Sequence, residues 1–167
     1  MIQLVPMTES DFADYCQNAA EEYANEKIAS GNWHPSEALE RAKQEFNNLL
    51  IDGLKTENHF LFLLQDELSG NKIGMIWFML EPKRPIPVAF IFDFIIYVSF
   101  RNKGFGLKAL LKTEAKAFDM GARRMELHVF EHNKAAQALY EKAGYQITNL
   151  NMAKQLGQSD LPHSRSI

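Results

Sequence analysis

The chain has 167 residues, a length that suits one domain with its own core. Hydrophobic residues make up 46%, charged residues 23%, and the net charge is −3, which argues against a broad basic face for nucleic acid or an anionic membrane. The single cysteine, Cys16, excludes an internal disulfide and fits a reducing compartment. Neither a signal peptide nor a bilayer-length apolar run is visible, so we expect a cytoplasmic protein without a membrane partner.

Hydrophobic periodicity predicts one continuous domain over residues 1–156, in which strands and helices are mixed. Thr8 followed by Asp11 indicates a capping box at the first helix. Residues 157–167 have no apolar period and are expected to form a loose tail. In chain order we expect a strand at 2–5, helices at 8–27 and 36–50, strands at 59–64, 73–80 and 88–98, a helix at 107–118, a strand at 124–129, a helix at 133–143, and strands at 145–148 and 151–156.

Asp93 is the one charged residue in the apolar strand predicted over 88–98. Such a strand is typical of the middle of a sheet covered on both faces. Burial of an unpaired carboxylate is costly and raises its pKa, which would suit a general base. Two other roles are open from the sequence: a core ion pair with a lysine or arginine, and an anchor for a substrate without proton transfer.

A glycine-containing turn, Arg101-Asn-Lys-Gly104-Phe-Gly106, follows this strand and precedes a predicted helix. A helix N-terminus offers unpaired N–H groups and the positive end of the helix dipole, so it suits a phosphate or pyrophosphate. Lys103 and Lys108 add positive charge nearby. Taken alone, the motif is equally compatible with a tight strand–helix turn that carries incidental basic residues.

Two other phosphate-binding motifs fit this turn poorly. The Walker string, Gly-x-x-x-x-Gly-Lys-Ser/Thr, is absent. A dinucleotide fingerprint would have Ala109 in place of its third glycine, which is tolerated, but the ribose-binding acid expected ~20 residues later falls on Glu126 at best. Dinucleotide binding is therefore the weaker alternative.

Two motifs in the order and spacing of one family are present between residues 91 and 145. The first runs Ile96-Tyr-Val-Ser-Phe-Arg101-Asn-Lys-Gly104-Phe-Gly106, and the second includes Asn133-Lys-Ala-Ala136-Gln-Ala-Leu139-Tyr140-Glu-Lys-Ala-Gly144-Tyr145. Together they resemble the core of the GNAT superfamily of N-acetyltransferases. Small departures are Val98, where the family often has proline, and Asn102, where it often has glycine.

This resemblance implies an α/β (α+β) fold, with a mixed, mostly antiparallel sheet of about six to seven strands flanked by about four helices. It implies transfer of an acetyl group from acetyl-CoA to a primary amine by direct attack in a ternary complex, with no metal. A non-catalytic acyl-CoA-binding module of the same fold is the alternative. The residues it assigns to the cofactor are Ile96, Val98, Arg101, Asn102, Lys103, Gly104, Phe105, Gly106, Leu107 and Asn133.

By the same resemblance, Tyr140 would protonate the leaving thiolate, although a helix tyrosine that only packs on the sheet is the structural alternative. Asn133 could also be a helix N-cap. The acceptor, a small-molecule or peptide amine, would bind among the N-terminal helices and the strand after them. Candidate acceptor residues are Tyr23, Glu26, Trp33, His34 and His59, although an aromatic residue on a helix stripe is usually a core residue and a lone histidine is usually just a hydrogen-bonded side chain.

His128 and His132 are four residues apart but lie on a predicted strand and loop, so metal binding is not expected. The partner we expect is the amine acceptor and not a nucleic acid. The chain is expected to be a monomer or a homodimer.

Overall fold

A computed structural model describes residues 1–154 and 156 of the chain. Within them the chain forms five strands, four α-helices and two short 3-10 turns. In chain order these are β1 (Ile2–Pro6), α1 (Glu9–Ala29), α2 (Ala38–Leu49), η1 (Gly53–Lys55), β2 (His59–Asp66), β3 (Lys72–Glu81), β4 (Val88–Ile96), η2 (Val98–Phe100), α3 (Phe105–Asp119), β5 (Arg124–Leu127) and α4 (Lys134–Lys142).

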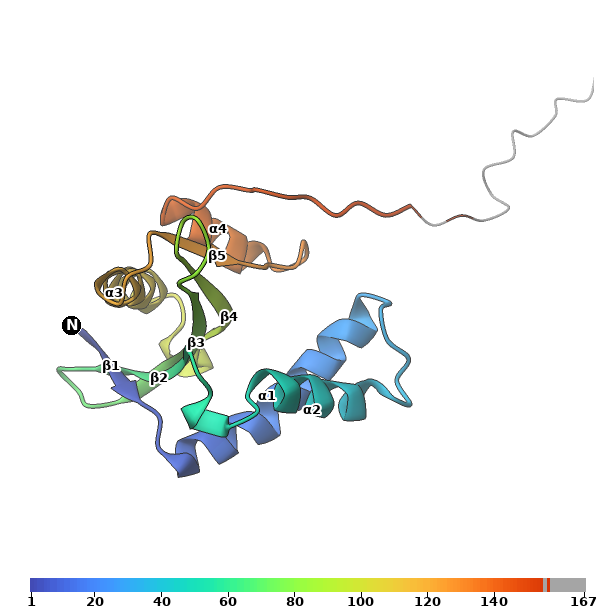
Figure 1. The fold of residues 1–167 in the computed structure, drawn as a ribbon, viewed down its shortest axis with the longest axis horizontal. Coiled ribbons are helices and arrows are strands. Elements are labelled where there is room, and N and C mark those ends of the chain that lie inside the picture. Colours follow the sequence, from blue (N-terminus) through green and yellow to red (C-terminus); the bar gives the residue numbers. More distant parts are fainter. Residues whose placement is uncertain (155, 157–167) are drawn as a thin grey trace, which may run out of the picture.

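The five strands form one sheet in the order β1-β2-β3-β4-β5. Neighbours from β1 to β4 are antiparallel, whereas β5 pairs with β4 in parallel. Helices α1 and α2 lie on one side of the sheet and α3 and α4 on the other (Figure 1). The mixed, mostly antiparallel architecture predicted from the sequence is confirmed, with five strands in place of six to seven.

Helix α1 begins at the predicted capping box. The Thr8 hydroxyl accepts the backbone N–H of Asp11, and the Asp11 carboxylate accepts the backbone N–H of Thr8. The helix buries Tyr15 and Ala19 against the sheet, where they join a core cluster with Trp77. The predicted start of the next helix was wrong: Ser36 was expected to cap a helix from residue 36, but α2 begins at Ala38 with Glu37 as its N-cap.

The core has one layer on each face of the sheet. Ile91, Phe94 and Ile96 of β4 belong to the layer shared with α3 and α4. Phe92 and Ile95 belong to the layer shared with α1 and α2. Ile91 and Phe94 face the same side of the sheet although they are three residues apart. The cause is a β-bulge: Trp77 pairs with Asp93 and Phe78 pairs with Ile91, so Phe92 has no partner on β3.

Several predicted strand ends were wrong. The strand expected over 88–98 ends at Ile96, and Val98 lies in η2; the strand expected over 124–129 ends at Leu127. Among the described residues, no strand forms over 145–148 or at 151–154 and 156. Residue 155 is not among the described residues. An extended segment becomes a strand only when a neighbour takes its backbone hydrogen bonds, and here the segment after α4 runs away from the body (Figure 1). The tail expected over 157–167 also lies outside the described residues.

The search for membrane-spanning helices covered only the described residues and found none that is both long enough and apolar enough to cross a bilayer.

Candidate active site

The turn before α3 presents backbone N–H groups to open space. Asn102 and Gly104 both adopt positive φ, 59° and 77°, and Gly104 is the N-cap of α3 without a capping side chain. The first N–H groups of an α-helix have no intrahelical acceptor. A Cβ on Gly104 would meet no atom within 4 Å, so the space beside these donors is free for an anion.

The two glycines of this motif have different roles. A Cβ on Gly106 would lie 3.2 Å from Cδ2 of Leu139, so this glycine lets α3 approach α4 closely. The sequence interpretation assigned both glycines to the phosphate. Only Gly104 faces open space, and Gly106 serves helix packing.

The basic side chains of this turn hold its own backbone. Arg101 Nε donates to the Ile96 carbonyl at 2.8 Å, and Lys103 Nζ donates to the Ser99 carbonyl at 2.9 Å. Both residues are exposed. The favourable environment for an anion therefore comes first from the backbone donors, and Arg101 mainly ties the turn to the end of β4.

Strands β4 and β5 separate along their length. They pair only from Val88↔Arg124 to Ile91↔Leu127, and β4 continues to Ile96 with no neighbour on that side among the described residues. Tyr97 N–H donates to Ile73 on β3, so the carbonyl of Ile96 in the same trans peptide points toward the open side. The Ile96 carbonyl already accepts from Arg101 Nε, so an extended ligand that pairs with this edge as an added strand would share that acceptor with Arg101 or displace it.

The bulge turns Asp93 toward α1. Simple alternation would place Asp93 on the same face as Ile91, but its Oδ2 accepts a 2.9 Å hydrogen bond from the Tyr15 hydroxyl on α1. Burial raises the pKa of Asp93 to about 6, an effect that the Tyr15 hydrogen bond opposes and the nearby negative charge of Glu22 reinforces. A carboxyl group with this pKa is largely ionised at neutral pH yet close enough to neutrality to exchange a proton.

Tyr140 on α4 lies within electrostatic reach of Asp93. Burial and, to a smaller extent, the negative charge of Asp93 together raise its pKa to about 12. The ring packs beside Tyr145, with centroids 5.6 Å apart. Tyr140 is therefore protonated at neutral pH and is available as a hydrogen-bond and proton donor. The catalytic roles expected for Asp93 and Tyr140 stay predictions.

Asn133 is the N-cap of α4, and its side chain accepts from Ala136 N–H at 3.1 Å. This bond bears out the capping role proposed from the sequence.

The acceptor candidates separate into two groups. Tyr23 donates to Glu45 at 2.9 Å and packs edge-on against Trp33 at 5.5 Å, so both aromatic residues join α1 to α2. Glu26 and His59, by contrast, contact residues outside α1 and α2. His34 is exposed and contacts the Ser36 hydroxyl at 2.7 Å.

His59 lies beside the bulge. Its Nδ1 accepts a 3.0 Å hydrogen bond from Trp77 Nε1, and its ring stacks on Phe92 with centroids 5.7 Å apart. Burial lowers the pKa of His59, which favours the neutral imidazole. His59, Trp77 and Phe92 thus form an aromatic cluster beside Asp93, on the face of the sheet that α1 covers.

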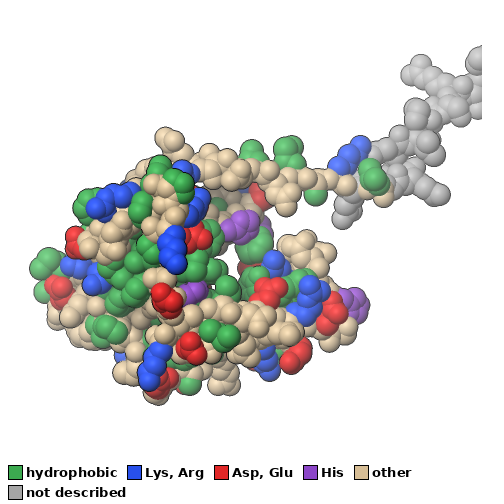
Figure 2. Space-filling view, in the orientation of Figure 1, with side chains coloured by type: hydrophobic (Ala, Val, Ile, Leu, Met, Phe, Trp, Pro, Cys, Tyr) green, Lys and Arg blue, Asp and Glu red, His purple; other side chains and the backbone are tan. Residues whose placement is uncertain are grey.

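Glu26 connects the two halves of the molecule. Its carboxylate lies 2.9 Å from Nε2 of His132, in the loop between β5 and α4. The His132 ring stacks on Phe130 at 5.5 Å. Figure 2 shows a hollow between the α1–α2 half and the α3–α4 half, with histidine side chains at its edge.

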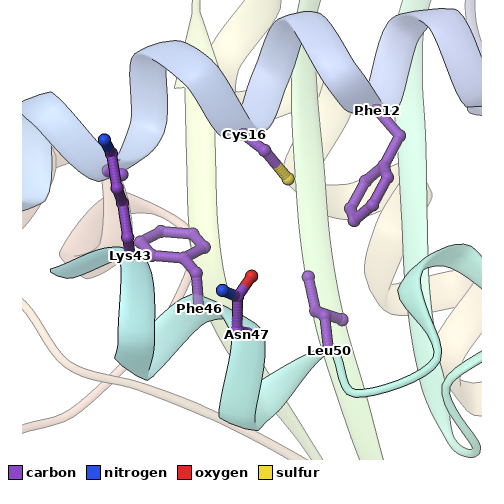
Figure 3. Close-up of a pocket in the computed structure, with 7 residues that line it drawn as sticks. Phe12, Cys16, Lys43, Phe46, Asn47 and Leu50 are labelled. Atoms are coloured by element: carbon purple, nitrogen blue, oxygen red, sulfur yellow. The ribbon is translucent and has the colours of Figure 1, made fainter. Parts of the chain in front are cut away.

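A second cavity, of about 330 Å³, lies between α1 and α2. Phe12 and Cys16 enter it from α1, Phe46 and Asn47 from α2, and Leu50 from the turn directly after α2 (Figure 3). None of the residues assigned to catalysis or to cofactor binding lines it.

Tyr15, Glu22 and His132 were missed by sequence reasoning as members of the site. Tyr15, Glu22 and Glu26 follow one another at intervals of seven and four, which places them on one stripe of α1. That stripe was a usable signal, but Tyr15 also fits the apolar pattern of a core position.

An uncapped helix N-terminus, a β4 edge that is not paired with β5 beyond Ile91, and a buried carboxyl with a raised pKa therefore lie along β4 and the turn after it. Residues 18–145 match the model of the acetyltransferase (GNAT) family. The chain belongs to this family, and it is an acetyltransferase.

Two curated relatives come from Bacillus subtilis (strain 168). The chain is 39% identical to the uncharacterized N-acetyltransferase YycN, over 93% of this chain and 99% of YycN. It is 37% identical to the uncharacterized N-acetyltransferase YdgE, over 92% and 97%. The crystal structure of YycN superposes with a TM-score of 0.89, covering 95% of this chain and 100% of YycN, which confirms the fold.

A more distant structure shares the fold alone. AAC(6′)-Iy, solved in complex with the bisubstrate analogue CoA-S-monomethyl-acetylneamine, is 15% identical to the chain. It superposes with a TM-score of 0.59, over 94% of this chain and 99% of AAC(6′)-Iy.

Proposed function

We infer that the protein is an acetyl-CoA-dependent N-acetyltransferase that transfers the acetyl group to a primary amine by direct attack in a ternary complex. The observation that carries this proposal is the buried carboxyl of Asp93, with a pKa near 6, on the part of β4 that no longer pairs with β5, and within electrostatic reach of the protonated phenol of Tyr140 on α4. Family membership supports the reaction class. The CoA-containing analogue in AAC(6′)-Iy supports the cofactor.

The turn before α3 would hold the pyrophosphate of the cofactor. The donors are the backbone N–H groups of residues 102–107, including Asn102, Lys103, Phe105 and Leu107, with Gly104 leaving room beside them. The pantetheine arm would extend along the open edge of β4 at Ile96 and reach the turn at Val98. Asn133 would contact the arm from the start of α4, in addition to capping that helix.

The chemistry needs a neutral amine, a stabilised tetrahedral intermediate and a protonated leaving thiol. The amine nitrogen attacks the thioester carbonyl carbon, forming the C–N bond. An acceptor that arrives as an ammonium ion first loses one proton to solvent, and Asp93 then accepts the second proton that the nitrogen loses as the amide forms. The C–S bond then breaks, and Tyr140 donates a proton to the departing sulfur. The products are the acetylated amine and free CoA.

The acceptor would enter from the α1 face of β4. Asp93, Glu22 and Glu26 give this region negative charge, which favours an amine that arrives as an ammonium ion. His59 and the aromatic residues around it would supply apolar contact. Tyr23 and Trp33 would act on the acceptor indirectly, through the packing of α1 on α2.

Two measurements test this function. Titration calorimetry with acetyl-CoA should give binding, and absence of heat at millimolar cofactor would contradict the cofactor assignment. A free-thiol assay with a panel of alkylamines, diamines, aminoglycosides, amino acids and peptides should then show amine-dependent CoA release. Binding without release for any amine class would favour the non-catalytic acyl-CoA-binding module.

A further inference from the structure

The hydrogen bond between Trp77 and His59 fixes which ring nitrogen of His59 carries the proton. Trp77 Nε1, which can only donate, lies 3.0 Å from His59 Nδ1, so Nδ1 is the unprotonated nitrogen. A neutral imidazole then has its hydrogen on Nε2, and burial favours the neutral ring by lowering its pKa. His59 therefore offers one N–H donor, on the ring nitrogen that Trp77 does not use.

This donor has no partner within the described part of the chain. No residue among 1–154 and 156 accepts a hydrogen bond from His59 Nε2, and Nε2 is not one of the fully buried side-chain atoms that lack a partner there. The side chain as a whole is half-buried. The N–H group therefore opens to solvent at the edge of an aromatic cluster, where a bound molecule can accept its hydrogen.

His59 lies on the same face of the sheet as Asp93. Trp77 is directly opposite Asp93 in the register of β3 and β4. His59 is opposite Met79, two residues further along β3, and is therefore diagonal to Trp77 on that face. Phe92 lies between, since its ring stacks on His59 at 5.7 Å and on Trp77 at 4.6 Å. An acceptor with its nitrogen at Asp93 would cross Phe92 and meet the His59 donor.

We propose that the acceptor carries, besides its amine, a neutral hydroxyl or carbonyl oxygen that accepts the hydrogen bond from His59 Nε2. The inference rests on the proposed function, because that function places the amine at Asp93. A second ammonium group has only N–H donors and would oppose the His59 donor, which disfavours diamines. A carboxylate could accept the bond, but the negative charges of Asp93 and Glu22 disfavour an anion in this site. The substrate class is therefore amino alcohols, amino sugars and other amines with a neutral oxygen.

Matched amines test the oxygen. Amine-dependent CoA release by the full chain is compared for amino alcohols, the alkylamines that lack their hydroxyl and the diamines of the same length, and for an amino sugar and its deoxy form. The best oxygen-bearing amine should exceed its deoxy partner in kcat/KM by about 3- to 10-fold, the range of one neutral hydrogen bond. A diamine used as well as the amino alcohol, or deoxy partners equal to their oxygen-bearing amines throughout, would overturn the inference.

Two substitutions of His59 separate its donor from its packing. His59→Gln places an amide N–H near the position of Nε2. His59→Asn places an amide oxygen near Nδ1, where it can accept from Trp77, but has no group that reaches the position of Nε2. The readout is kcat/KM for an oxygen-bearing amine divided by that for its deoxy partner, a ratio that does not depend on the amount of folded enzyme. The ratio should fall to about 1 in His59→Asn and stay close to that of the parent in His59→Gln. An unchanged ratio in His59→Asn, or its loss in both variants, contradicts the proposed donor.

Nuclear magnetic resonance of the chain with nitrogen-labelled histidine gives a readout that needs no turnover. The ring nitrogens of His59, assigned by the loss of their signals in His59→Asn, should show a neutral ring with its hydrogen on Nε2. In the presence of CoA, an oxygen-bearing amine should shift the Nε2 proton downfield, and its deoxy partner should not. If no amine gives CoA release, the proposed function fails, and these shifts still decide the role of His59. A hydrogen on Nδ1, or no difference between the two amines, overturns the inference.

Discussion

The hydroxyl of Tyr15 donates a 2.9 Å hydrogen bond to Oδ2 of Asp93 and so joins α1 to the bulged part of β4. This bond stabilises the carboxylate form and therefore holds the pKa of Asp93 below the value that burial alone would give. Tyr15 is itself buried, and its own pKa lies well above 10, so it stays protonated as the donor.

We predict that Tyr15→Phe moves the pH dependence of catalysis to higher pH. If Asp93 is the base, kcat/KM rises with pH through its pKa of about 6, because only the ionised form accepts a proton. Loss of the hydrogen bond should raise this pKa by about 1–2 units, since a hydrogen bond to a charged group contributes about 1.5–3 kcal/mol. The measurement is kcat/KM for the amine against pH.

Tyr23→Phe is the control for this experiment, because it also removes a 2.9 Å bond from a phenol to a carboxylate, that of Glu45. Its acidic limb should coincide with that of the parent. A Tyr15→Phe profile that also coincides with the parent would separate Tyr15 from the chemistry.

Asp93→Asn should remove the acidic limb of the profile and lower the rate at neutral pH by at least ~10²-fold, the usual scale of general-base catalysis. If Asp93 only anchors a cationic acceptor, the substitution would raise KM for the amine with a smaller effect on kcat. Steady-state kinetics at saturating acetyl-CoA distinguish the two roles. A rate and a KM equal to those of the parent would leave proton removal to water.

Asp93→Asn, which should lower the rate, should increase the stability of the folded protein at neutral pH. The pKa of Asp93 is raised from 3.8 to about 6 in the folded protein, so ionisation costs stability, and this cost is absent below about pH 4 and complete above about pH 6. Asp93→Asn should therefore be more stable than the parent by roughly 1–3 kcal/mol at pH 7 to 8 and similar to it near pH 4. Denaturant unfolding at the two pH values measures this. A variant less stable at neutral pH would instead indicate the buried ion pair considered from the sequence.

Tyr140→Phe should lower kcat by about 10- to 100-fold while acetyl-CoA affinity stays within about twofold, because only a proton donor is removed from the ring. Titration calorimetry and kcat with one amine measure the two effects. Thiol release with a better leaving group, such as an acyl ester of an acidic thiol, should be much less affected. Equal loss for both donors would indicate that Tyr140 has only a packing role.

The sequence predicted most of the fold because the signals involved are local. Period and capping located α1, α3 and the hairpin of β2 and β3, and the two family motifs located the turn before α3. The face of the sheet on which Asp93 lies was not predictable. The extra residue at Phe92 reverses the alternation of side chains between the two faces, and no local sequence pattern indicates this bulge. The strands expected after Tyr145 would need a neighbouring strand, and the hydrophobic pattern of the segment does not show whether such a neighbour is present. Tyr23 and Trp33 are residue types that are common in binding sites, but here their rings pack on each other between α1 and α2.

Gly104→Asp tests the proposed cofactor turn. The substitution places a carboxylate where the pyrophosphate would lie, and like charge at close range opposes binding. Acetyl-CoA affinity should fall by at least ~100-fold, measured by titration calorimetry. The backbone cost of a side chain at positive φ is a separate effect, which requires its own control.

Gly70→Asp supplies that control. Gly70 has a φ of 70° against 77° for Gly104, and at both positions a new Cβ meets no atom within 4 Å. Gly70 lies in the turn between β2 and β3, away from α3, so the two variants share the strain and the added charge but not the location. Both should lose about 1–2 kcal/mol of unfolding free energy by denaturant titration. Only Gly104→Asp should lose acetyl-CoA; equal affinities in the two variants would place the phosphate elsewhere.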